Sequence, residues 1–220
     1  SKVNEVYLHL KVDSGLSREL ADYFTFEVPG AKFMPIYKKR IWDGKIRLYS
    51  QQTNKIYCGL LPYVKQFCSR NSIDYIIEEG VEDDRNLIRE DVRAFTESLR
   101  PQSKGTQLEI RDYQINAILH SLRKHRSLIV SPTASGKSLI IYTLIRYYNL
   151  LLKDKKILIL VPTTSLVEQM YSDFIDYGWS DRYIHRIYSG HERITNKPVI
   201  ISTWQSLYKM PKKYFENFGC

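Results

Sequence analysis

Three consecutive residues, Gly136-Lys137-Ser138, carry the clearest chemistry in the sequence. An apolar run at 127–130 precedes them, and an apolar stretch long enough for a helix begins at Lys137. In a strand–turn–helix of this kind, backbone N–H groups of the turn and of the first helical turn converge on phosphate oxygens. The lysine reaches the β- and γ-phosphates, and the serine hydroxyl holds Mg²⁺. We therefore predict a site for a nucleoside triphosphate and Mg²⁺.

The residues of this predicted phosphate loop have separate roles. Lys137 and Ser138 are the catalytic candidates, and Ser138 is also the candidate metal ligand. The turn that cradles the phosphates consists of Thr133, Ala134, Ser135 and Gly136. One departure from the usual Gly-x4-Gly-Lys-Ser/Thr pattern is that Ser131 occupies the first glycine position. The alternative interpretation is an ordinary strand–turn–helix with a surface lysine.

A polar segment about twenty residues upstream of the loop could recognise the base. It contains Arg111, Tyr113 and Gln114. The glutamine amide can pair with the donor and acceptor edge of adenine, and an aromatic ring or a guanidinium can stack on the base. We therefore predict that the nucleotide is ATP and that these residues contact its adenine. A solvated glutamine at a helix start is the alternative.

Two later segments each place threonines between an apolar strand and a helix. The candidates for contact with nucleic-acid phosphates are Thr163, Thr164, Thr203 and Gln205. A helix N-terminus offers free N–H groups to such phosphates. For the first segment the alternative is simply a well-capped helix, because Ser165 and Glu168 fit a capping box. Trp204 could serve either the core or a contact.

The charge of the chain is strongly polarised. The formal net charge is +9, residues 32–70 carry nine basic residues and one acid, and residues 74–97 carry nine acids and three basic residues. A basic surface of this kind favours a polyanionic partner. The candidates for DNA contact in this half are Lys38, Lys39, Arg40, Lys45 and Arg47. The alternative is a solvated basic turn, with Trp42 in the core.

Bulk properties exclude several classes of protein. A chain of 220 residues with 43% hydrophobic composition is expected to fold. No apolar stretch approaches the ~20 uncharged residues that span a bilayer, and the N-terminus shows no signal-peptide pattern. Cys58, Cys68 and Cys220 are too few and too scattered for a zinc site or a disulfide framework.

The elements that position these residues can be estimated from apolar periodicity. In the first half we expect strands at 3–12, 45–50, 55–59 and 73–77 and helices at 17–24, 60–70 and 86–99. In the second half we expect strands at 127–130, 156–161, 183–188 and 198–202 and helices at 113–124, 137–152, 165–177 and 203–208. The polar span 101–106 is typical of a linker, so we predict domains at 1–100 and 107–220. Strands that alternate with helices indicate a mainly parallel sheet in the second domain.

Taken in order and spacing, the four motifs of the second half resemble those of the first RecA-like domain of superfamily 2 helicases. The segment 33–48 and the later helix at 59–68 resemble the N-terminal domain of UvsW-type phage recombination and repair helicases. This resemblance implies an α/β fold, with a small α+β DNA-binding domain followed by a partial RecA-like P-loop domain. It also implies ATP-dependent remodelling of branched or duplex DNA and of RNA–DNA hybrids, in the cytoplasm of a phage-infected bacterial host cell.

The Asp-Glu-x-His motif and the second RecA-like domain of such helicases do not occur before Cys220. We therefore expect this chain to bind DNA and part of ATP but to be inactive alone, with C-terminal helicase domains in cis or in trans. A non-enzymatic DNA-binding module on a helicase-like scaffold is the main alternative. A small-molecule P-loop kinase is a weaker one, because it leaves the basic N-terminal segment unexplained.

Overall fold

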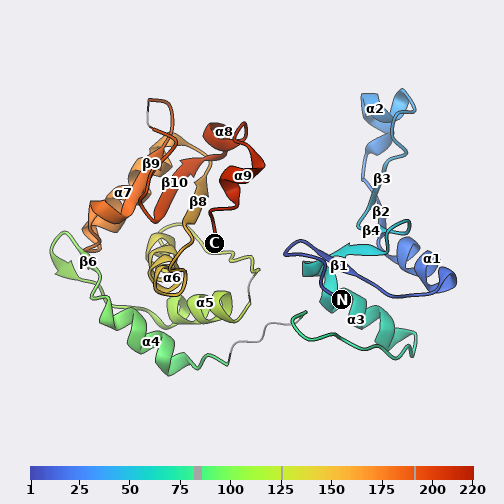
Figure 1. Ribbon diagram of the computed structural model, residues 1–220, viewed down its shortest axis with the longest axis horizontal. Coiled ribbons are helices and arrows are strands. Elements are labelled where there is room, and N and C mark those ends of the chain that lie inside the picture. Colours follow the sequence, from blue (N-terminus) through green and yellow to red (C-terminus); the bar gives the residue numbers. More distant parts are fainter. Residues whose placement is uncertain (82–85, 125, 191) are drawn as a thin grey trace. The chain divides into compact units, whose positions relative to one another are not determined.

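The computed structural model describes residues 1–81, 86–124, 126–190 and 192–220. The chain forms two units, Ser1–Asp83 and Asp84–Cys220, and both are drawn in Figure 1. The predicted boundary near residue 100 therefore differs from the observed division, which comes earlier in the chain.

The first unit combines short strands with helices, as predicted. Its elements are β1 (Tyr7–His9), α1 (Ser14–Tyr23), β2 (Thr25–Glu27), α2 (Pro35–Lys38), β3 (Lys45–Arg47), β4 (Tyr49–Ser50), β5 (Lys55–Tyr57) and α3 (Leu61–Arg70). The antiparallel sheet has the order β1-β5-β4. Leu8 pairs with Ile56 in register, and these side chains are 2% and 0% exposed. Leu20 of α1 and Phe67 of α3 belong to the same buried cluster, so both helices close the sheet on one core.

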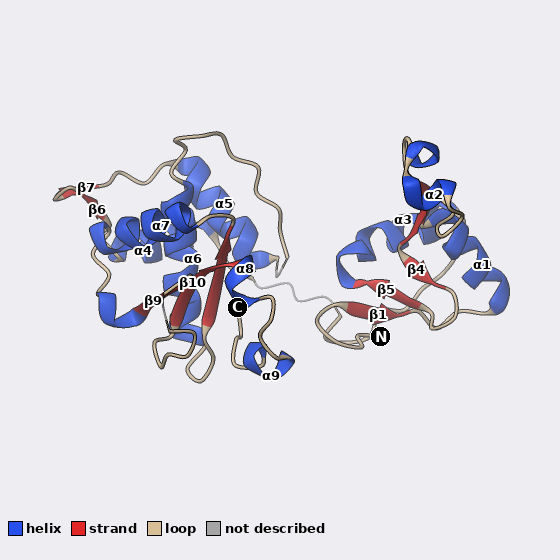
Figure 2. Ribbon diagram, turned by 90° about the horizontal axis from the view of Figure 1, so that it is seen from above, coloured by secondary structure: helices blue, strands red, loops and turns tan. Residues whose placement is uncertain are grey.

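A two-stranded arm, formed by β2 and β3, extends away from this core. In it β2 pairs with β3 in antiparallel register, with Phe26 opposite Ile46. Figures 1 and 2 both show the arm ending at the short helix α2. Gly44 has φ +77°, and a Cβ there would lie 3.0 Å from Cβ of Ala31 and 3.1 Å from the Tyr37 ring. The close return of the chain at the tip of the arm therefore depends on glycine.

The second unit contains the parallel sheet expected from the alternation of strands and helices. Its elements are α4 (Arg89–Ser98), β6 (Gln102–Ser103), β7 (Thr106–Gln107), α5 (Asp112–Arg123), α6 (Lys137–Leu151), β8 (Ile157–Val161), α7 (Thr164–Asp176), β9 (Ile184–Ile187), β10 (Val199–Thr203), α8 (Trp204–Leu207) and α9 (Lys212–Phe215). The sheet order is β8-β10-β9, and both pairings are parallel. Figure 2 shows these strands side by side. Every residue of the central strand β10 is buried, as expected for a strand covered on both faces.

Two predicted strands are wrong. Residues 73–77 form no strand, and Ile76 is 95% exposed. Residues 127–130 form no strand either, and Leu128 and Val130 are 87% and 89% exposed. An apolar run becomes a strand only where a neighbouring strand can pair with it. One edge of β8 pairs with β10, and beside the other lies the C-terminal segment, whose Cys220 carbonyl accepts from the Leu158 N–H at 2.8 Å. The prediction that the phosphate loop follows a strand of the sheet is therefore corrected, because the segment before the loop is irregular.

Helix α4 falls within the predicted first domain, 1–100, but in the structure it belongs to the second unit. Val92 is 3% exposed and lies in one buried cluster with Ile115 and Ile118 of α5. Ion pairs add to this packing, because Arg89 and Arg93 both contact Asp112 and lower the pKa of its carboxyl group. The apolar face of α4 is thus covered by α5.

The predicted linker at 101–106 is an ordered hairpin. Strands β6 and β7 pair in antiparallel register. The Asp176 carboxylate near the end of α7 accepts hydrogen bonds from the Lys104 backbone N–H at 2.9 Å and from the Ser103 hydroxyl at 3.0 Å. These bonds tie the hairpin to the second unit. Within the described residues no helix is long and apolar enough to cross a membrane.

Candidate nucleotide and nucleic-acid sites

The predicted phosphate loop turns sharply before α6 begins. Ala134 and Gly136 both have left-handed backbone conformations, with φ of 62° and 76°. Gly136 is the N-cap of α6, and its carbonyl accepts from the Leu139 N–H at 3.1 Å. The free N–H groups of the first helical turn begin at the same point. The loop therefore gathers backbone donors at the start of a helix of 15 residues.

Lys137 is exposed and lies over its own loop. Its ammonium group donates to the carbonyl oxygens of Pro132 at 2.7 Å and Ser131 at 3.1 Å. Both partners are neutral, so a phosphate oxygen would be a stronger acceptor for this charge. The lysine is thus positioned beside the turn that would cradle phosphates.

Two residues of the upstream motif, Tyr113 and Gln114, form hydrogen bonds to the backbone of the phosphate loop. The Tyr113 hydroxyl donates to the Ser135 carbonyl at 2.9 Å, and the Gln114 amide donates to the same oxygen at 3.2 Å. Gln114 also accepts from the Arg111 N–H at 2.9 Å and is only 5% exposed. Its amide therefore faces the loop backbone. The prediction that Gln114 contacts adenine remains a prediction, and the structure shows a supporting role beside it.

The position of the Gln114 side chain explains why the motif has glycine at position 136. A Cβ on Gly136 would lie 2.4 Å from Nε2 of Gln114. Because that amide is buried and bonded at both ends, it cannot move aside without losing its partners. Ser131, at the unusual position of the motif, donates to or accepts from the Ser135 hydroxyl. A serine is therefore accommodated where many phosphate loops carry glycine.

A cavity of about 540 Å³ opens beside the loop. Arg111 and Tyr113 line one part of it and residues 131–135 another. A guanidinium and a phenol ring suit a base, and the loop amides suit phosphates. The residues present therefore fit a nucleotide, with Arg111 and Tyr113 toward the base and the loop toward the phosphates.

Ser138, the predicted metal ligand, is half-buried at the start of α6. Burial raises the pKa of Tyr177 to about 12, and the Ser138 side chain acts in the opposite direction. Within the described residues, His, Cys, Asp and Glu side chains form no cluster that could hold a metal ion. Cys58, Cys68 and Cys220 are free thiols.

The threonines predicted to contact nucleic acid have different environments. Thr163 is the N-cap of α7 and accepts from the Leu166 N–H at 3.3 Å, so the predicted capping box at Ser165 is wrong by two positions. Thr164 and Gln205 are exposed. Thr203 is only 5% exposed, and its hydroxyl bonds Ser206 at 2.8 Å. Burial at the end of a central strand gives this side chain little exposure, and its contact with a phosphate remains a prediction.

The five basic residues predicted to contact DNA all lie on the two-stranded arm. Lys38, Lys39 and Arg40 are exposed at its tip, and Arg40 has a left-handed backbone with φ 56°. A surface hollow of about 740 Å³ at the tip is lined in part by Lys38 and Arg40. The arm therefore presents a run of cations to solvent.

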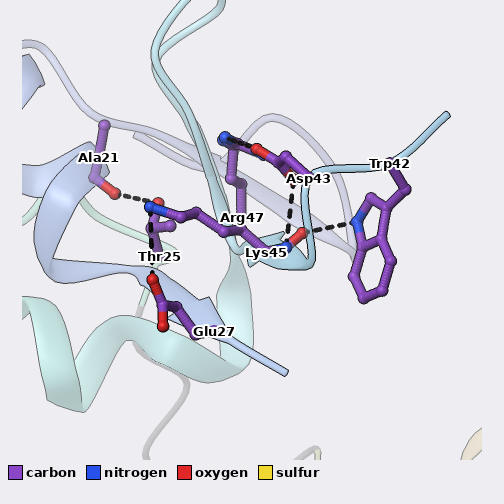
Figure 3. Close-up of polar contacts among 7 residues, drawn as sticks. All are labelled: Ala21, Thr25, Glu27, Trp42, Asp43, Lys45 and Arg47. Carbon is purple, nitrogen blue, oxygen red and sulfur yellow. Dashed lines mark hydrogen bonds and ion pairs between the residues drawn. The ribbon is translucent and has the colours of Figure 1, made fainter. Parts of the chain in front are cut away.

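Lys45 and Arg47, nearer the core, are partnered within the arm (Figure 3). Lys45 lies 3.7 Å from the Glu27 carboxylate. Arg47 pairs with Asp43 and lowers the pKa of that carboxyl group to about 2. The Trp42 indole N–H donates to the Lys45 carbonyl at 2.9 Å. Trp42 is therefore a half-buried residue of the arm that belongs to none of the buried clusters of the described residues, so it does not lie in the core that the alternative interpretation expected.

Sequence reasoning missed the exposed apolar groups at the tip of the arm and Tyr208 in the second unit, and it left Trp204 undecided between the core and a contact. Phe33 and Ile41 at the tip of the arm are 71% and 74% exposed, and Trp204 and Tyr208 near α8 are 56% and 61% exposed. The sequence does contain a sign that these residues are exposed, because each pair lies within a few residues of lysines in a stretch poor in acids. Apolar periodicity cannot tell such surface residues from core residues.

Comparisons with known proteins match both units. A family model described as "DNA helicase UvsW, N-terminal" matches residues 4–78, and one described as "Type III restriction enzyme, res subunit" matches residues 107–219. The ATP-dependent DNA helicase uvsW of Enterobacteria phage T4 is 35% identical over 220 residues, covering 97% of this chain and 43% of the relative. The chain thus spans less than half the length of that curated relative.

Solved structures of UvsW proteins also match this chain. A crystal structure of the UvsW helicase from bacteriophage T4 superposes with a TM-score of 0.87 at 33% identity, covering 98% of this chain and 78% of that one. Another crystal structure of T4 UvsW gives a TM-score of 0.88 at 33% identity, covering 98% and 44% of the two chains.

The fold, the phosphate loop and these matches define a superfamily 2 helicase region, with part of a RecA-like domain after a small α+β domain. The predicted fold class and the predicted resemblance are both confirmed. The chain belongs to the UvsW family of DNA helicases.

Proposed function

We propose that the protein to which this sequence belongs is an ATP-dependent DNA helicase that remodels branched DNA and RNA–DNA hybrids in recombination and repair. The family and its phage relative support this activity. The observation that carries it is the phosphate loop, which Tyr113 and Gln114 brace at the Ser135 carbonyl. The phage relative further supports a site of action in the cytoplasm of an infected bacterium.

In this proposal the chain's own residues hold Mg²⁺ and ATP. Lys137 exchanges its two loop carbonyls for phosphate oxygens, while the loop amides bind the remaining oxygens. Ser138 offers its hydroxyl to the metal, and Arg111 and Tyr113 lie against the base. When bound, Mg²⁺ neutralises charge that develops on the β- and γ-phosphates.

DNA contact would involve both units. The exposed cations Lys38, Lys39 and Arg40 on the arm attract the phosphate backbone. Thr164 and Gln205 offer polar groups on the second unit. Lys45 and Arg47 contribute less, because Glu27 and Asp43 already neutralise them. Closure of the nucleotide site is assigned to C-terminal helicase domains, supplied in cis or in trans.

A titration with a fluorescent ATP analogue in the presence of Mg²⁺ tests the nucleotide site. Lys137→Ala is expected to weaken binding by about tenfold or more, since it removes a charge-assisted contact to phosphate. Lys153→Ala removes an exposed lysine of the same unit and is expected to leave binding unchanged. Both variants should bind branched DNA as well as the unmodified chain does.

The main alternative, a non-enzymatic DNA-binding module, makes a different prediction. Such a module would bind DNA but no nucleotide, so the Lys137→Ala and Lys153→Ala variants would be indistinguishable from the unmodified chain in both titrations. A chain that bound nucleotide but no DNA would contradict the helicase assignment instead.

A further inference from the structure

An exposed aromatic pair lies just beyond the sheet of the second unit. Trp204 and Tyr208 are 56% and 61% exposed, and their ring centroids are 5.9 Å apart in an edge-to-face arrangement. Trp204 is the first residue of α8 and Tyr208 is its C-cap, with the Tyr208 N–H donating to the Trp204 carbonyl at 2.9 Å, so the two side chains lie on the same face. Large aromatic side chains exposed together usually mark a binding surface.

The pair lies at the same edge of the sheet as the start of α7. Thr203, the last residue of β10, pairs in parallel register with Val161, the last residue of β8. The turns that follow these two strands therefore emerge side by side. One leads to exposed Thr164, and the other leads directly to Trp204 and Gln205.

The surroundings of the pair are basic. Nζ of Lys209 lies 5.4 Å from the Tyr208 ring centroid, and Lys212 and Lys213 are exposed nearby in sequence. Residues 193–215 contain five basic residues and no acid. A polyanion with flat apolar groups matches this combination, whereas an acidic protein surface would leave the rings unmatched.

We infer that Trp204 and Tyr208 form a stacking platform for unpaired bases of single-stranded DNA, with Lys209 beside them for the backbone. This inference rests on the proposed DNA binding and specifies its substrate. Contacts to phosphate alone carry no information about the bases. Stacking on a side chain requires a base that is not already stacked in a duplex, so the platform favours a separated strand over an intact helix.

The first test compares a thymine oligonucleotide with an abasic oligonucleotide of the same length. The unmodified chain is expected to prefer the thymine strand, and the double variant W204A/Y208A should lose roughly 5- to 150-fold in affinity for it, as stacking of one base predicts. Its affinity for the abasic strand should change little. The matched control W204F/Y208F keeps two rings and should retain most of the preference.

The second test locates the contact. An oligonucleotide carrying 5-iodouracil, bound to the unmodified chain and irradiated, should crosslink to the peptide that contains Trp204 and Tyr208. Crosslinks confined to other peptides, or a base preference that survives in W204A/Y208A, would overturn the inference while leaving DNA binding intact. A chain that binds branched DNA but neither oligonucleotide would overturn the inference alone, and one that binds no DNA at all would refute the proposed DNA binding as well.

Discussion

At the scale of single residues, the nucleotide site depends on a contact between two motifs that are distant in sequence. The Gln114 side chain touches the phosphate loop so closely that only glycine fits at position 136. The residues Gly136, Lys137 and Ser138 could be predicted from their types and spacing. The bracing contact could not, because it depends on how α5 packs beside the loop.

Gly136→Ala should therefore cost more than backbone strain alone. Gly105 has a similar left-handed φ, 78° against 76°, but a Cβ there meets nothing within 4 Å. Gly105→Ala thus measures the strain, about 1 kcal/mol. Gly136→Ala should lower the free energy of unfolding by roughly 1–3 kcal/mol more, because it displaces the Gln114 amide from its buried partners. Urea unfolding of both variants checks this, and equal losses would contradict the contact.

Asp43 pairs with Arg47 and neutralises its charge, so we expect it to limit any contact of Arg47 with DNA. Because Arg47 lowers the pKa of Asp43 to about 2, the carboxylate remains charged as pH falls from neutral and is lost only as pH falls through about 2. Between pH 5 and pH 8 this pair should therefore add no pH dependence to DNA binding.

Asp43→Asn should release Arg47 and tighten DNA binding. If Arg47 then gains one phosphate, the plot of log affinity against log salt should steepen by about 0.9. Glu19→Gln removes the same charge from an exposed site on α1 and serves as the control. A salt dependence that is the same in both variants would show that Arg47 does not reach DNA.

At the scale of elements, the β6–β7 hairpin shows how a segment with the composition of a linker becomes ordered. Asp176→Ala removes the acceptor for the Lys104 N–H and the Ser103 hydroxyl. We expect a loss of about 1–2 kcal/mol in the stability of the second unit, measured by urea unfolding. Asp154→Ala, at another exposed acid, should have no such effect. Equal stability of the two variants would mean that the hairpin is not held by Asp176.

Most elements of the fold could be predicted from periodicity, and the failures share one cause. Helices such as α3, α5 and α6 and the buried strands β8 and β10 follow the apolar pattern to within a residue or two. Residues 127–130 have an equally apolar sequence but form no strand, because pairing depends on a neighbour that periodicity does not reveal. The same limit applies to α4, whose apolar face was assigned to the wrong domain.

We propose that DNA binding by the first unit depends on the arm. The double variant K38E/K39E should weaken binding to branched DNA by at least tenfold at low salt, since it replaces phosphate contacts with repulsion. The control R18E/R70E makes the same charge change at exposed sites on α1 and α3. If the control weakens binding as much, the effect is one of net charge, and the arm has no special role.

At the scale of the whole molecule, the division between the units lies before α4. Val92→Ala should therefore destabilise the second unit by about 1–3 kcal/mol, because Val92 is buried against α5. The fluorescence of Trp179, which is 5% exposed in the second unit, follows that transition in urea. Val3→Ala, at an exposed position of the first unit, is the control. An unchanged transition of Trp179 would place α4 outside the second unit.

The central claim is that backbone amides between Thr133 and Ser138 cradle the phosphates of a nucleotide. Amide NMR spectra recorded during titration with ADP and Mg²⁺ test it most directly. The account predicts that the N–H signals of residues 133–138 show the largest shifts, and that Lys137→Ala greatly reduces them. Nucleotide-dependent shifts that leave these six amides unchanged would contradict it.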